Sequence, residues 1–190
     1  ALNVTGKDQI LDSKTICGVR LALYTGLRDG SIRGAKWDEI DFDSATWEVP
    51  ASRMKSGRSH KVPLPAQAIA ALKELKPITH RGNSSYIFPS SGKYGFMAEN
   101  TLRTALHRLG YEVTIHGMRS LITDVLNEHE FHPDAIERQL DHAERNGSRK
   151  PYLRTDFMAK RIEMMQWFAD WCDEQAGHLN SNDDSLKAAA

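Results

Sequence analysis

The sequence predicts an α+β fold that is mostly α-helical, with a small three-stranded antiparallel sheet near the N-terminus. After residue 66, apolar residues recur mainly at helical spacing. Residues 37–65 instead show short extended runs of apolar residues that polar turns separate. Hydrophobic residues make up 40% of the 190, which allows a substantial core.

The first predicted helix covers residues 8–24, "DQILDSKTICGVRLALY". Its apolar residues Ile10, Cys17, Leu21 and Tyr24 lie at near-helical spacing, so one side should be buried. The following "TGLRDGS" contains glycines and an aspartate, which break the helix.

The predicted sheet follows directly. "WDEIDFDSATWEVP" indicates two short strands around a polar turn at residues 43–45, and "HKVPLP" indicates a third strand after the turn "MKSGRS". Pro63 has no backbone N–H to donate, so the third strand should lie at an edge of the sheet.

The remainder is predicted to be helical. "AQAIAALKELK" should form a helix that ends at Pro77, followed by the polar "THRGNSS", the extended "YIFPS" and the flexible "SSGKYGF". "AENTLRTALHRLG", "HGMRSLITDVLNEH" and "HPDAIERQLDH" indicate three more helices. "RTDFMAKRIEMMQWFADWCDEQ" indicates a long final helix, before a polar, disordered tail at residues 176–190. The expected apolar stripe of that helix consists of Phe157, Ile162, Met165, Phe168 and Trp171.

Composition narrows the function classes. No stretch approaches the roughly 20 apolar residues that span a bilayer, and the opening "ALNVTGKDQILD" is not a secretory signal. Cys17 and Cys172 form neither a disulfide framework nor a metal site, which favours a reducing, intracellular setting. The formal net charge of +0 is untypical of nucleic-acid-binding domains. However, acidic residues gather after residue 170, so one face elsewhere can still be basic.

Two basic loops are candidate sites. Arg28 lies in the glycine-flanked turn "TGLRDGSIRGAKW", where a surface arginine is the simpler interpretation. Lys55 lies near a hairpin tip, with Arg53 and Arg58 beside it. A solvated turn explains this cluster, and a mobile basic finger that enters a nucleic-acid groove is the functional interpretation.

Two further segments carry histidines. His116 and Arg119 are three residues apart in "HGMRS", so a helix would place both on one face, near an anion-binding N-terminus. His142 follows "QLD", and Tyr152 lies among basic residues in "RKPYLRTDF". Alone, His142 could be a helix C-cap and Tyr152 an aromatic anchor for the last helix.

In combination these residues supply what phosphoryl transfer on DNA requires. Attack on a phosphodiester raises the charge on its non-bridging oxygens, which two arginines can clamp bidentately. An attacking tyrosine, with a pKa of about 10, must lose its proton, and a neighbouring histidine can accept it. A mobile lysine can protonate the leaving 5′ oxygen. The set, in chain order, is Arg28, Lys55, His116, Arg119, His142 and Tyr152.

With this set in order, the sequence resembles the catalytic domain of the tyrosine recombinases, the phage-type integrases. Within that family it is most similar to the integrases of prophages and genomic islands. The resemblance covers about residues 8–173. The matching segments are "TGLRDGSIRGAKWDEIDFDSATWEVPASRMKSGRSHKVPL", "HGMRS", "IERQLDHAERN" and "YLRTDFMAKRIEMMQWFADW".

The resemblance implies a tyrosine recombinase catalytic fold over residues 1–175 and a DNA integrase activity. Strands would be cut and rejoined through a 3′-phosphotyrosine on Tyr152, without a metal or nucleotide cofactor. The six residues above would be catalytic. The implied partner is double-stranded DNA at attachment sites, bound by a homotetramer, whereas the isolated domain would be a monomer. No membrane is involved, and the location is the bacterial cytoplasm, on the nucleoid. The expected DNA-binding residues are Arg53, Arg58, Arg149, Lys150 and Arg154.

Two departures from the family pattern stand out. Ser31 occupies a position that is usually acidic in the family, which puts efficiency in question, and Asp29 is a nearby substitute. The arm-binding and core-binding domains of such integrases are expected to be absent from this chain. The alternatives are a catalytically degenerate DNA-binding accessory factor, a topoisomerase-like enzyme, and a hydrolase of small phosphorylated substrates.

Overall fold

The computed structural model describes residues 11–81, 84–142 and 155–188, with side chains in the last helix described as far as residue 177. The helices are α1 (Ser13–Thr25), α2 (Asp29–Arg33), α3 (Ala66–Thr79), α4 (Thr101–Arg108), α5 (Ile115–Glu128), α6 (Pro133–Gln139) and α7 (Met158–Ala188). The strands are β1 (Ile40–Asp41), β2 (Thr46–Val49) and β3 (His60–Pro63), and two 3-10 helices are η1 (Trp37–Glu39) and η2 (Ala51–Arg53). The predicted mostly helical α+β fold is confirmed.

The sheet is antiparallel, in the order β1-β2-β3. Trp47 on the central strand pairs with Ile40 on one side and with Val62 on the other, and its indole ring is fully buried. Pro63 lies on the edge strand, as predicted, where a missing N–H costs no ladder hydrogen bond.

The ends of α1 explain why the helix covers these residues. Asp12 caps the first turn, because its carboxylate accepts hydrogen bonds from the backbone N–H groups of Lys14 and Thr15 at 2.9 and 3.0 Å. Gly26 ends the helix in the left-handed conformation, with φ of 66°. A side chain at Gly26 would have its Cβ 2.6 Å from Cδ2 of Leu140, so the turn packs tightly against the end of α6.

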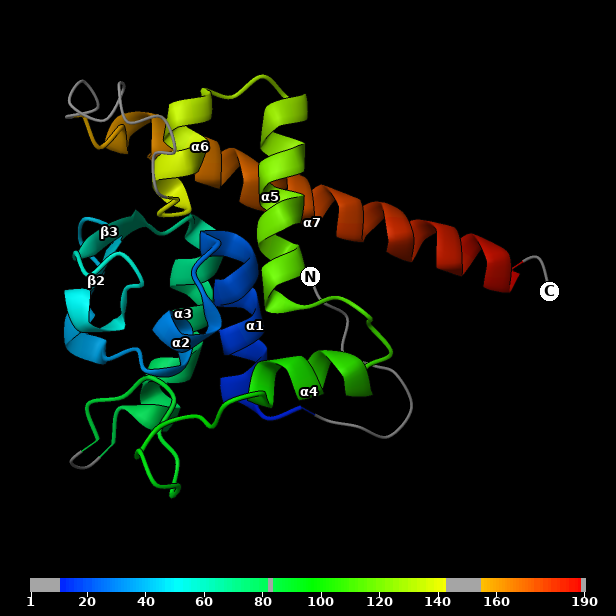
Figure 1. The fold of residues 1–190 in the computed structure, drawn as a ribbon. Helices are drawn as coiled ribbons and strands as arrows, with labels where there is room; N and C mark the ends of the chain where they lie inside the picture. Colours follow the sequence, from blue (N-terminus) through cyan, green and yellow to red (C-terminus); the bar gives the residue numbers. More distant parts are fainter. Residues whose placement is uncertain (1–10, 82–83, 143–154, 189–190) are drawn as a thin grey trace.

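Two apolar clusters form the core. The first joins α1, the sheet and α3 around Leu21, Trp47 and Leu72, and the second joins α5, α6 and α7 around Ile122 and Phe168. Figure 1 shows α1 and α3 in the middle of the molecule, between the sheet and α5, with α6 at one end. The end of α1 therefore meets the second cluster, and this junction positions the candidate site.

The structure corrects three details. α3 continues through Pro77 to Thr79, because a proline in the last turn removes a single hydrogen bond and the helix ends shortly after it. Ile162 is 49% exposed, and the buried stripe of α7 instead includes Met164 and Arg161, one helical turn apart. The helix also extends through residues 176–188, where the sequence predicts a disordered tail, and these turns lie away from the other helices (Figure 1).

Candidate functional site: an arginine cluster at the junction of α1, α5 and α6

Arg28 lies at the start of α2, two residues after the left-handed Gly26. Its backbone is extended, with φ of −71° and ψ of 149°, and it is the N-cap residue of α2. The side chain is 36% exposed, so its guanidinium can reach both the protein and a ligand.

Arg119 is the buried partner in this cluster, with 4% of its surface exposed. One guanidinium nitrogen donates to the carbonyl oxygen of Gly26, and Nη2 donates to that of Leu140 at 2.7 Å. Burial, followed by the like charge of Arg28, lowers the pKa of Arg119 to about 10. Arg119 thus joins the end of α1 to the end of α6 and remains a cation at neutral pH.

Asp141 follows α6 and interacts electrostatically with both arginines. Its Oδ2 is 3.7 Å from Nη1 of Arg28, and its side chain is only 9% exposed. Among the described residues, the cluster therefore holds two guanidinium groups and one carboxylate, with a net positive charge that suits an anionic ligand.

Both predicted histidines lie at the ends of helices that lead into the cluster. His116 is exposed in the first turn of α5, one turn before Arg119. His142 follows α6, and its Nδ1 is 3.0 Å from Oε2 of Glu137. Since the carboxylate accepts, Nδ1 carries a proton, which leaves Nε2 of a neutral His142 as the proton acceptor.

The hairpin residues differ from one another. Lys55 and Arg58 are exposed in the turn before β3. Arg53 is only 17% exposed, and its guanidinium donates to the carboxylate of Glu39 and to the carbonyl oxygen of Gly34. Arg53 therefore holds η2 against η1, rather than pointing into solvent as a phosphate contact would. Tyr152, Arg149, Lys150 and Arg154 lie outside the described residues.

Ser31 stands at the position near Arg28 that is usually acidic in the family, and Asp29 is the substitute considered for it. Ser31 is buried, and its hydroxyl donates to the carbonyl oxygen of Arg53 at 3.2 Å. Asp29 pairs with Arg33 at 2.5 Å, one helical turn further along α2. Among the described residues, the carboxylate that pairs with Arg28 therefore belongs to neither of them but to Asp141.

Sequence reasoning missed a buried polar network beside the cluster. Nε2 of His60 donates to the carbonyl oxygen of Gln139 at 3.0 Å, and the Gln139 amide donates to that of Thr25 at 2.8 Å. Arg161 donates to Oε1 of Gln139 at 3.0 Å. In the sequence, His60 precedes Lys61 in "HKVPLP", and Asp141 precedes His142 in "QLDH". No local pattern marks His60 or Asp141 as buried.

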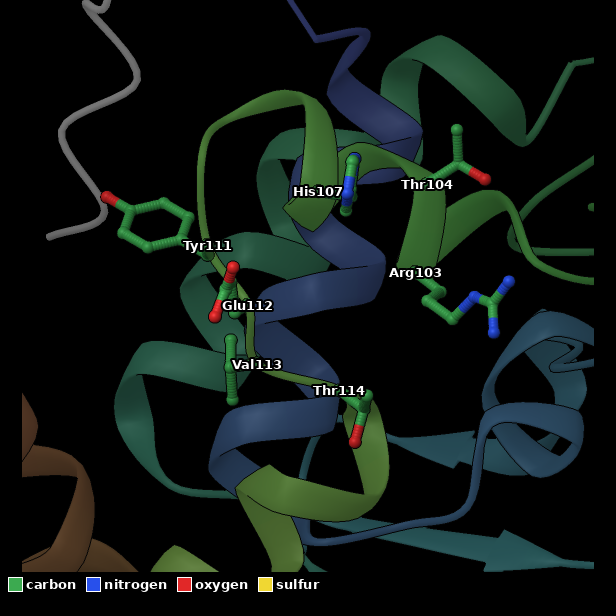
Figure 2. A pocket seen from close by; sticks show the side chains of 7 residues that line it. All are labelled: Arg103, Thr104, His107, Tyr111, Glu112, Val113 and Thr114. Carbon is green, nitrogen blue, oxygen red and sulfur yellow. The ribbon is translucent and has the colours of Figure 1, made fainter.

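A separate hollow of about 490 Å³ lies between α4 and the start of α5. Arg103 and His107 from α4 line it together with the segment that ends at Thr114, the N-cap of α5 (Figure 2). No predicted catalytic residue lines this hollow.

Within the described residues, no group of His, Cys, Asp and Glu side chains could hold a metal ion. No helix in that part of the chain is long and apolar enough to cross a membrane.

Known relatives are similar in sequence to this chain over most of its length. The model of the Phage integrase family matches residues 2–158. Prophage integrase IntA of Escherichia coli (strain K12) is 41% identical over 163 residues, which are 84% of this chain and 39% of that protein. The integrase of Enterobacteria phage P4 is 39% identical over 178 residues, 84% of this chain and 40% of that protein. The chain thus spans about two fifths of the length of these relatives.

Solved structures share the fold. The integrase from mycobacterium phage Brujita superimposes with a TM-score of 0.65 at 17% identity, over 84% of this chain and 53% of that one. XerA recombinase gives a TM-score of 0.57 at 20% identity, over 79% of this chain and 59% of that one. The Tn1549 transposon integrase, solved in complex with circular intermediate DNA, gives 0.57 at 17% identity, over 85% and 62%.

Proposed function

Because the chain belongs to the phage integrase family, we propose that it is the catalytic domain of a site-specific DNA recombinase. It cuts and rejoins strands through a 3′-phosphotyrosine on Tyr152, and so integrates and excises a prophage or genomic island. The observation that carries the proposal is the junction where Arg28 and Arg119 converge. Two histidines lie at helix ends leading into that junction.

The arginine cluster suits a phosphodiester. As a nucleophile attacks phosphorus, negative charge grows on the two non-bridging oxygens, and donors fixed in advance lower the barrier most. Arg119 is fixed by its bonds to the Gly26 and Leu140 carbonyl oxygens, so little reorganisation is needed. Arg28 is half-exposed and supplies the second guanidinium from the solvent side.

The remaining groups balance the reaction. A bond forms between Oη of Tyr152 and phosphorus, and the bond from phosphorus to the 5′ oxygen breaks. Nε2 of His142 or the ring of His116 accepts the tyrosine proton, and Lys55 donates a proton to the 5′ oxygen. The reverse sequence, with a different 5′ hydroxyl as the attacking group, rejoins the strand. The phosphotyrosine conserves the bond energy, so no metal or nucleotide cofactor takes part.

Double-stranded DNA at attachment sites is the proposed partner, bound by a homotetramer in the bacterial cytoplasm. The isolated domain is proposed to be a monomer. Arg58, Arg149, Lys150 and Arg154 contact phosphates in this proposal, and Arg58 supports it by being exposed beside Lys55. Arg53 is not included, because its guanidinium is already paired with Glu39. The neutral overall charge supports a weak hold on DNA by this chain alone.

The test is covalent capture. The chain is incubated with a library of nicked duplexes of randomised sequence. Cleavage beside the nick releases a short strand end that diffuses away, so the strand cannot be rejoined and the covalent adduct accumulates. We expect adducts that survive denaturation and that recover a common sequence, and none with Tyr152→Phe. An adduct that persists in Tyr152→Phe would contradict the nucleophile. DNA binding without any adduct would favour the accessory-factor alternative.

A further inference from the structure

Asp141 occupies a costly position that the proposed chemistry does not use directly. Its backbone is left-handed, with φ of 49°, a conformation that glycine adopts without strain and other residues at a cost of roughly 1 kcal/mol. Its Oδ2 is buried and has no hydrogen-bond partner among the described residues. A carboxylate held in this way needs a compensating charge.

Within the described part of the chain, the compensating charge is Arg28, whose Nη1 is 3.7 Å from Oδ2. This distance is an ion pair and not a direct hydrogen bond, so the guanidinium keeps its donors for another ligand. The pair joins the start of α2 to the end of α6, and these two helix ends are more than 100 residues apart in the chain.

Asp141 also acts on the second arginine. The charges of Arg28 and Arg119 repel, and the Arg28 charge lowers the pKa of Arg119, whereas the Asp141 charge raises it. Arg119 in turn donates to the carbonyl oxygen of Leu140, the residue before Asp141. One short segment thus holds Arg119 through its backbone and Arg28 through a side chain.

Three other described acids have partners of their own. Asp29 pairs with Arg33, Glu39 pairs with Arg53, and Glu137 contacts His142. Ser31 offers a hydroxyl that points to a backbone carbonyl instead.

We propose that Asp141 is a positioning residue for the phosphate clamp, which orients Arg28 and offsets its repulsion of Arg119. The inference rests on the proposed function, because it assigns Asp141 to the same site. It does not require Asp141 to touch DNA. Its carboxylate is nearly buried whereas Arg28 is partly exposed, so a bound phosphate would meet the exposed side of the guanidinium.

Two variants test it. Asp141→Asn keeps the shape, and Asp141→Gly relaxes the left-handed backbone, so neither should unfold the chain. We expect both to slow adduct formation at saturating nicked duplex by about tenfold or more, while the apparent Kd changes less than about threefold, because orientation and not binding is lost. Asp43→Asn is the control, because it makes the same change at an exposed aspartate in the turn between β1 and β2, and it should keep the rate of the unmodified chain.

A second measurement needs no activity. In the ¹⁵N NMR spectrum of the DNA-free chain, the Arg28 guanidinium should rotate slowly, and Asp141→Asn should release it while Asp43→Asn should not. Unchanged adduct rates and an unchanged Arg28 signal in both Asp141 variants would overturn the inference, and faster cleavage would show an inhibitory carboxylate instead. If the unmodified chain forms no adduct, the proposed function fails, and the NMR result alone decides the role of Asp141.

Discussion

Arg161 on α7 donates a 3.0 Å hydrogen bond from Nε to Oε1 of Gln139 on α6, and both side chains are buried. Nη2 of Arg161 donates to the carbonyl oxygen of Lys61 on β3 at 2.8 Å, and the Gln139 amide donates to that of Thr25 at the end of α1. The buried pair of Arg161 and Gln139 therefore connects α7, α6, β3 and the end of α1. These elements carry or precede the candidate catalytic residues. A buried guanidinium in such a network is costly to interrupt.

Replacing Arg161 with methionine should destabilise the chain by about 3 kcal/mol, because it leaves Oε1 of Gln139 and the Lys61 carbonyl without their donor. Urea denaturation would measure the change from the transition midpoint. Lys160→Met is the matched control, since Lys160 is the exposed neighbour on the same helix and should cost less than about 0.5 kcal/mol. Equal midpoints for the two variants would contradict the role of the network.

His60 should make stability depend on pH. Burial lowers its pKa from 6.5 to about 4, so the ring stays neutral in the folded chain where the unfolded chain takes up a proton. Its contribution is therefore present above about pH 6.5 and is lost as the pH falls toward 4, by up to about 3 kcal/mol.

Carboxylates titrate in the same range, so the measurement is a comparison. Urea midpoints between pH 4 and 7 should fall less steeply for His60→Gln than for the unmodified chain. His107→Gln removes an exposed histidine and should leave the slope unchanged. Parallel curves for all three chains would show that His60 is not buried as the neutral ring.

Alanine substitutions at Gly26 and Gly57 separate the stability cost of backbone strain from the cost of side-chain packing. Both have positive φ, 66° and 67°, so alanine costs each about 1 kcal/mol. A Cβ at Gly57 meets nothing within 4 Å, whereas one at Gly26 would lie 2.6 Å from Cδ2 of Leu140 and 3.1 Å from Cδ1 of Ile122. We therefore expect Gly26→Ala to cost about 2–3 kcal/mol more than Gly57→Ala in thermal unfolding. A similar cost at both sites would mean that the contact with Leu140 relaxes freely.

Periodicity predicted the elements that carry the site, because each buries one face against a core. α1 and α5 repeat apolar residues every three or four positions, and Trp47 marks the central strand of the sheet. The stripe of α7 was wrong at Ile162, because a buried arginine, Arg161, takes the core position that periodicity gives to an apolar residue.

The polar partners could not be predicted from local sequence. Asp141 meets Arg28, and Arg53 meets Glu39, only after the chain has folded, and an acid or a base in a loop is normally solvated. The same applies to Gln139, whose partners lie on three other elements. The order of residue types predicted the arginine cluster, but the groups that hold its members in place required the structure.

The contrast between Arg119 and His116 separates holding the site from performing the reaction. Arg119→Lys cannot reach both the Gly26 and Leu140 carbonyl oxygens with one ammonium, so it should lose about 2 kcal/mol of stability. Adduct formation on the nicked duplex should fall by about a hundredfold, because a fixed donor to the phosphate is lost as well. His116→Gln changes an exposed side chain one turn away and should slow the reaction with stability unchanged within about 0.5 kcal/mol. Urea midpoints and adduct rates measured on both variants test this division. A stable Arg119→Lys would show that the two carbonyl contacts do not hold α1 to α6, and a destabilised His116→Gln would place His116 in the scaffold and not in the reaction.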